Sequence, residues 1–151
     1  MLSENAGEPW AYKELGLSNM YLGRLDEALD WFAKAERIGP RDPARWTWLD
    51  GRGQALILLG RDEDAVRALI SAAEANPRSA GTQALLAAAY ALAGRTDAAQ
   101  TALAAYLAKH PDARASTFRR FAPVPLAATG REYRWKREHL LEGLRRAGMP
   151  A

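Results

Sequence analysis

The chain has 151 residues, of which 48% are hydrophobic and 26% charged, with no cysteine and a formal net charge of +3. This length is sufficient for one domain with a buried core, and the absence of cysteine excludes disulfides and thiolate metal sites. Because the sequence has neither a signal peptide nor an apolar run long enough to cross a bilayer, we expect a cytoplasmic protein that does not enter the membrane.

Glycine and proline recur at fixed intervals along the chain. Each glycine precedes its proline by 17 residues, and successive pairs are offset by 37 and then 34 residues. The pairs are Gly23 with Pro40, Gly60 with Pro77, and Gly94 with Pro111. This period indicates stacked helical hairpins, in which the glycine ends the first helix in a left-handed conformation and the proline ends the second. We therefore predict six helices, near residues 10–22, 25–38, 44–59, 62–75, 80–93 and 96–109.

Three repeats contain these helices, and small residues stand in the middle of their first helices. The repeats span residues 9–42, 46–79 and 80–113, after an N-terminal extension at 1–8. Glycine inside a helix costs about 1 kcal/mol relative to alanine, which predicts a close approach of the paired helix. The small residues are Gly16, Gly53 and Ala87 in the first helices, and Ala28, Ala65 and Ala99 in the second.

Helix starts are also marked by residue type. Asp42, which precedes Pro43, is a predicted N-cap, and so are Ser79 and Thr96.

Small, aromatic and proline residues at these positions resemble the tetratricopeptide repeat (TPR) over residues 9–113. Two residues depart from the pattern, because Asn19 replaces a large residue and Arg52 replaces a leucine. The resemblance implies a right-handed superhelix of three hairpins, in which the first helix of each hairpin lines a concave face.

Residues 114–151 form a basic tail with 9 Lys/Arg and 3 Asp/Glu, whereas residues 1–113 carry 12 and 15. We predict a short helix at 113–121, breaks at 122–125 and 129–130, and an amphipathic helix at 131–147. Since the open end of a helical stack needs cover, the last helix is expected to cap the third repeat. The predicted fold class is therefore all-α: a right-handed TPR superhelix (α-α solenoid) of three hairpins plus a C-terminal capping helix.

Three segments carry a narrower resemblance: residues 38–48, residues 85–90, and the ending Leu-Glu-Gly-Leu-Arg-Arg-Ala-Gly-Met-Pro at 141–150. They are similar to the C-terminal TPR region of bacterial class III adenylate cyclases and related winged-helix regulators. This resemblance implies the regulatory part of a bacterial signalling protein, and a chain that is a fragment or truncated relative without a cyclase domain.

No residue pattern indicates catalysis. His110 and His139 have no catalytic partners recognisable in the sequence. The segment at 61–64, with acids at 62–64, superficially resembles a metal loop, but acids in the first turn of a helix are better explained by the helix dipole. Gly51 and Gly53 lie inside a predicted helix and not in a phosphate-binding loop. We therefore predict no enzyme activity, no metal and no cofactor.

The concave face is the predicted binding site. Lys13 matches one position of the TPR carboxylate clamp, but Leu17 replaces the asparagine that the clamp needs. An apolar groove with a methionine suits an amphipathic helix or an extended peptide, so we predict a protein–protein interaction or scaffold module. The predicted partner-binding residues are Lys13, Leu17, Met20, Tyr21, Asp50, Gln54, Ile57, Leu58, Ala84, Ala88, Ala91 and Leu92.

Three alternatives stay open. The chain could fill its own groove with the tail or with residues 1–8, or it could form a homodimer through Trp10, Tyr21 or Trp31. The basic tail could also bind nucleic acid or another anionic partner. We favour packing for the tail, because its aromatic residues fall where contact with the last hairpin is expected.

Overall fold

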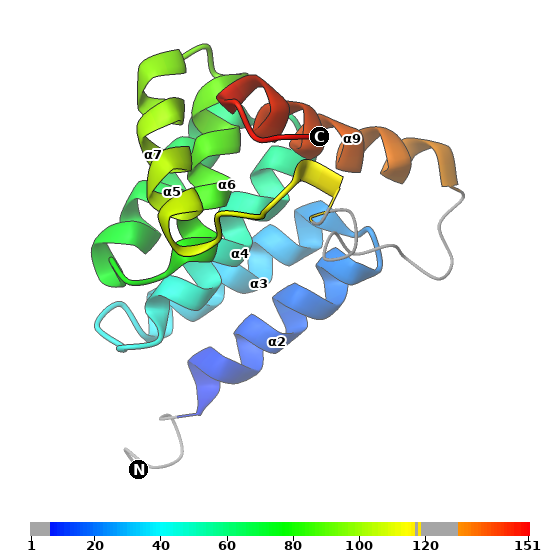
Figure 1. Ribbon diagram of the computed structural model, residues 1–151. Helices are drawn as coiled ribbons and strands as arrows, with labels where there is room; N and C mark the ends of the chain where they lie inside the picture. Colours follow the sequence, from blue (N-terminus) through cyan, green and yellow to red (C-terminus); the bar gives the residue numbers. More distant parts are fainter. Residues whose placement is uncertain (1–6, 117, 119–129) are drawn as a thin grey trace.

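A computed structural model describes residues 7–116, 118 and 130–151, with side chains from residue 136 onward in the last segment (Figure 1). Seven helices and no strand lie within these residues, and Ala115, Ser116 and Phe118, inside the predicted short helix at 113–121, are helical too. Each of the seven begins and ends within two residues of its predicted bounds. The helices are α2 (Glu8–Tyr21), α3 (Leu25–Ile38), α4 (Arg45–Leu58), α5 (Asp62–Ala75), α6 (Ala80–Leu92), α7 (Thr96–Lys109) and α9 (Gly130–Ala147).

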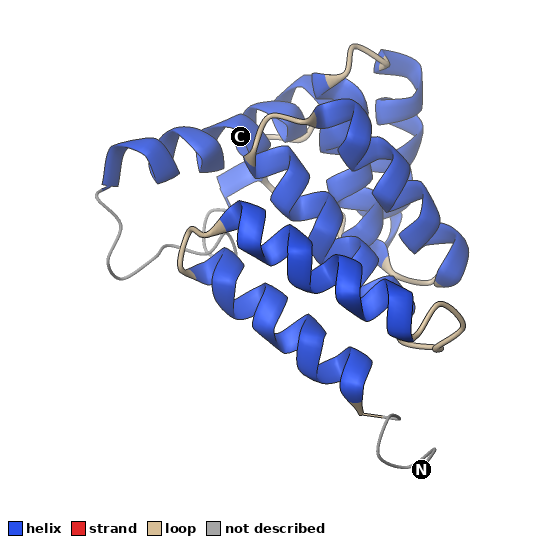
Figure 2. Cartoon of the chain, turned by 180° about the vertical axis from the view of Figure 1, so that it is seen from behind, coloured by secondary structure: helices blue, strands red, loops and turns tan. Residues whose placement is uncertain are grey.

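Consecutive helices pack as three hairpins, α2 with α3, α4 with α5, and α6 with α7. The hairpins join through α3 on α4 and α5 on α6, so that α2 and α7 lie at opposite ends of the stack (Figures 1 and 2). The predicted all-α repeat of helix pairs is confirmed. None of the described helices is long and apolar enough to span a bilayer.

Glycine closes the turn inside each hairpin, as predicted. Gly23, Gly60 and Gly94 have φ angles of 79°, 78° and 81°, in the left-handed region. Beyond Gly60, the Arg61 N–H donates to the Leu56 carbonyl at 2.9 Å, which satisfies a carbonyl at the end of α4.

Close approach within the hairpins is confirmed at two helical glycines. A Cβ added to Gly16 would lie 2.5 Å from Cε1 of Phe32, and one on Gly53 would lie 2.4 Å from Cγ of Leu69. The nearest neighbours are these large side chains and not the small residues Ala28 and Ala65 that the sequence indicated. Each glycine thus makes room for a bulky side chain from the second helix of its own hairpin.

The predicted N-caps are correct at one site of three. The Ser79 hydroxyl accepts from the Thr82 N–H at 3.3 Å. Asp42 is wrong as a cap, because its carboxylate accepts from the Ala44 N–H in the turn before α4. Thr96 is also wrong, since it is the first residue inside α7.

The last helix does not simply cover the end of the stack. Packing chiefly on α6, α9 also contacts α4 and α7 (Figure 1). Its Leu140, Leu141 and Leu144 are at most 1% exposed. Because α4 and α6 are first helices of their hairpins, α9 lies across the face that these helices share. The end of the predicted short helix at 113–121 and the two predicted breaks fall largely outside the described residues.

Candidate functional site

The shared face of the first helices is covered by the chain itself over the second and third hairpins. A Cβ added to Gly143 of α9 would lie 2.8 Å from the Ala88 carbonyl oxygen and 2.8 Å from Cδ1 of Leu92. Glycine therefore allows α9 to approach the backbone of α6. The alternative in which the tail occupies part of the groove matches this arrangement.

Polar contacts hold α9 and the end of the chain in place. His139 Nε2 lies 3.0 Å from Oδ1 of Asp62, in the first turn of α5. The Ala115 N–H donates to the Pro150 carbonyl at 2.7 Å, which joins the segment after α7 to the chain end. Sequence reasoning missed both contacts, because each joins residues more than 30 positions apart with no shared motif.

The twelve predicted partner-binding residues differ widely in exposure. Ile57, Leu58, Ala84 and Ala88 have no exposed surface, and Met20 and Lys13 are buried too. Tyr21, at 52%, is the exposed member of the set. The half-buried members are Leu17, Asp50, Gln54, Ala91 and Leu92.

Asp50 is engaged inside the protein. The buried Thr82 hydroxyl donates to Oδ1 of Asp50 at 2.7 Å, which ties α4 to the start of α6. Burial raises the pKa of the Asp50 carboxyl above its ordinary value of 3.8, and the hydrogen bond from Thr82 opposes that shift. This carboxylate, which belongs to the predicted partner-binding residues, thus has a partner in the next hairpin.

Exposed large hydrophobic side chains of the described chain gather in the first hairpin. They are Trp10, Leu15, Tyr21 and Leu22 in and just after α2, and Ile38 at the end of α3, each 42–53% exposed. One signal in the sequence could have indicated this surface. The apolar residues of α2 are distributed around the whole helix instead of along one stripe, so some of them must stay exposed.

One row along α2 combines aromatic rings with a cation. Trp10, Leu17 and Tyr21 are separated by seven and four residues, so they project from the same side of the helix. Lys13 Nζ lies 3.9 Å from the centroid of the Trp10 ring and 2.6 Å from Oε1 of Glu14. We call Trp10, Leu17 and Tyr21 the α2 row. Trp10 was considered only for dimerisation at the sequence level.

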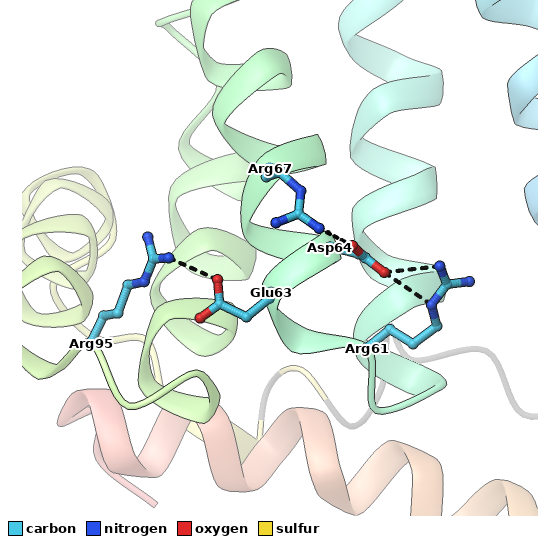
Figure 3. A network of polar contacts seen from close by, with 5 residues as sticks. All are labelled: Arg61, Glu63, Asp64, Arg67 and Arg95. Atoms are coloured by element: carbon cyan, nitrogen blue, oxygen red, sulfur yellow. Dashed lines mark hydrogen bonds and ion pairs between the residues drawn. The ribbon is translucent and has the colours of Figure 1, made fainter.

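The three acids at the start of α5 each face a cationic or imidazole side chain. Figure 3 shows Glu63 and Asp64 with their arginine partners. Asp64 accepts from Arg61 at 2.8 Å and from Arg67, and the hydrogen bond from Arg61 lowers the pKa of its carboxyl most. Glu63 accepts from Arg95 at 2.7 Å, which links the second hairpin to the third. No group of three metal-binding side chains occurs in the described part of the chain.

Much of the basic tail lies outside the described residues, including the side chains at 119–135. Among those described, Arg145 and Arg146 pair with Glu142 at 3.5 and 3.1 Å. Phe118 packs against Tyr106, with ring centroids 5.6 Å apart. These contacts use tail side chains within the fold.

No protein-family model matches this chain, and no significant match exists among curated proteins. Function is thus inferred from the repeat pattern and from the geometry of the exposed face.

Proposed function

We propose that this chain is a TPR-type protein interaction module that binds a protein partner along the α2 row. The observation that carries the proposal is the gathering of exposed large hydrophobic side chains in the first hairpin, while α9 covers the face of the second and third. Exposed apolar groups of this kind mark interaction surfaces. The bacterial signalling context suggested by residues 38–48, 85–90 and 141–150 belongs to the same proposal.

The row has the composition of an interaction hot spot. Tryptophan and tyrosine provide large contact areas at little entropic cost and dominate the energetics of many interfaces. Trp10 and Tyr21 are 45% and 52% exposed, so both retain surface that a partner could bury. Their spacing along one side of α2 suits a partner helix or extended segment that lies along α2.

This site is shorter than the groove predicted from sequence. Among the first helices, α2 alone has no contact with α9 in the described part of the chain, because α9 packs on α6 and also contacts α4. Lys13 is buried against the Trp10 ring and already pairs with Glu14, so the row offers a partner mainly apolar and aromatic surface. A partner with an apolar stripe along one side fits these features best.

Two substitutions in the row and one outside it test the proposal. Trp10→Ala and Tyr21→Ala are expected to weaken partner binding by about 2 kcal/mol, roughly thirtyfold, as is typical of hot-spot aromatics. Leu15→Ala is the matched control, because Leu15 is an exposed apolar residue of the same helix outside the row. Binding is measured by quantitative capture from nuclease-treated bacterial lysate at low and moderate salt, followed by titration with the captured partner.

A protein partner that survives moderate salt, is lost with both row variants and is kept by Leu15→Ala is the expected result. Identical partners on all three variants would contradict the α2 site. Capture that disappears with nuclease or at moderate salt would indicate instead that the basic tail binds nucleic acid or another anionic partner.

A further inference from the structure

A second recessed surface lies on other helices than the α2 row. Both α3 and α5 pack on α4 but not on each other, which leaves a cleft of about 270 Å³ whose floor is α4. The polar residues that line it are Glu36, Arg45, Arg52, Asp64, Arg67 and Ser71. Arginines thus outnumber carboxylates in the lining by three to two.

Both carboxylates of the cleft are already bound. Glu36 accepts from Arg45 Nη2 at 2.5 Å and from Trp48 Nε1 at 2.7 Å. Asp64 accepts from Arg67 and from Arg61, the latter outside the lining (Figure 3). Their charges are therefore neutralised within the protein, and they do not repel an incoming anion as isolated carboxylates would.

Arg52 supplies an unused cation. Its exposed guanidinium makes no hydrogen bond or ion pair with any other residue that the structure describes. Arg67 uses one of its nitrogens for Asp64, and its side chain remains 69% exposed. A guanidinium carries five N–H donors, so both arginines keep donors for a ligand. Arg52 is also the residue that departs from the leucine of the repeat pattern.

The third arginine strengthens the preference for a negative group. The Nε atom of Arg45 is buried and has no hydrogen-bond acceptor among the described residues. An unpaired donor of a charged group is costly in a protein interior, and a nearby anion lowers that cost electrostatically.

We propose that this cleft binds a phosphate monoester group, held between Arg52 and Arg67. A phosphate monoester carries 1.5 to 2 negative charges near neutral pH and three acceptor oxygens, which match two guanidinium forks. A single carboxylate would engage one fork and leave the other unpaired. The volume lies just below the roughly 300–1,000 Å³ of pockets for drug-sized ligands, so the cleft fits the phosphate group with its ester carbon better than a whole nucleotide.

Site-resolved titration of the full chain tests this. ¹H–¹⁵N spectra are recorded with inorganic phosphate or with phosphoserine blocked at both ends, each at constant ionic strength balanced with chloride. We expect saturable shifts centred on residues 45–52 and 64–71. Arg52→Gln is expected to weaken binding about tenfold, the loss of one charge-assisted hydrogen bond. Arg24→Gln is the matched control, because exposed Arg24 lies at the opposite end of α3 from Glu36, about 18 Å along the helix.

The two probes distinguish the source of the phosphate. Tighter binding of phosphoserine would identify a phosphorylated side chain, and equal binding would identify free phosphate as sufficient. Absence of saturable shifts in this region with either probe, up to the millimolar range, would overturn the proposal. Equal weakening by Arg24→Gln and Arg52→Gln would overturn it as well, because binding would then follow net charge alone. The spectrum of each variant also reports whether it is folded.

Discussion

Gly53→Ala measures how tightly the second hairpin is packed. A Cβ at residue 53 would lie 2.4 Å from Cγ, 2.5 Å from Cδ2 and 3.1 Å from Cδ1 of Leu69, which has no exposed surface. The clash includes the branch point of the leucine, so rotation of its methyl groups alone cannot relieve it. Overpacking of a core costs about 1–3 kcal/mol, whereas alanine in place of glycine gains about 1 kcal/mol of helix propensity. We expect a net loss of about 1 kcal/mol.

Gly81→Ala is the matched control. Gly81 lies near the start of α6, and nothing stands within 4 Å of an added Cβ. The same chemical change should therefore stabilise the protein by up to about 1 kcal/mol. Urea unfolding followed by circular dichroism gives both free energies. A Gly53→Ala protein as stable as Gly81→Ala would refute the close approach of α4 and α5.

A double-mutant cycle locates the clash. Leu69→Ala alone should cost about 2–5 kcal/mol, as for other buried leucines. In the Gly53→Ala background, the smaller side chain leaves room for the new methyl group, so the cost should fall by about 1–2 kcal/mol. Additive effects would show that residues 53 and 69 do not touch.

Three further predictions concern a turn, a carboxyl and the last helix. Gly60→Ala should destabilise the protein by about 1–2 kcal/mol in urea unfolding, because φ is +78° although the space around an added Cβ is open; an unchanged midpoint would contradict the left-handed turn. Asp50→Asn should stabilise the protein at neutral pH: the pKa of Asp50 is raised in the folded state, so its ionisation removes stability as pH rises through that folded-state pKa. The stability gain of Asp50→Asn, measured by unfolding at a series of pH values, should vanish below the ordinary pKa of 3.8. A gain that grows toward acidic pH would contradict a raised pKa for Asp50. Leu144→Ala should cost about 2–5 kcal/mol while Arg146→Ala, on the exposed side of the same helix, changes stability by less than about 1 kcal/mol; equal small effects would mean that α9 does not pack on the hairpins.

Local rules predicted the hairpins because their signals lie within a few residues of each other. A glycine that must adopt positive φ at residues 23, 60 and 94 marks each turn, and the prolines at 40, 77 and 111 follow the helix ends. The repeat period then places the hairpins side by side.

The candidate site was predicted less well, because it depends on contacts between distant segments. No sequence signal near Gly143 indicates that it packs against Ala88. Likewise, nothing near Thr82 indicates that its hydroxyl donates to the Asp50 carboxylate. The arginine cleft combines residues from three helices and matches no local motif. Trp10 and Tyr21 are exposed because α2 lies at the end of the stack, and the amino-acid composition of α2 does not predict this.

Thiol labelling at two predicted groove positions tests the α2 site most directly, since the chain contains no cysteine of its own. Single variants Tyr21→Cys and Leu58→Cys compare a half-exposed position with one that has no exposed surface. We predict that the thiol at 21 reacts readily with a maleimide and becomes protected when the captured partner is added at saturation, well above the roughly thirtyfold weakened Kd expected for loss of the Tyr21 ring, while the thiol at 58 stays unreactive throughout. A reactive thiol at 58 that the partner protects, with 21 unaffected, would show that partners bind beneath α9 and would contradict the proposed site.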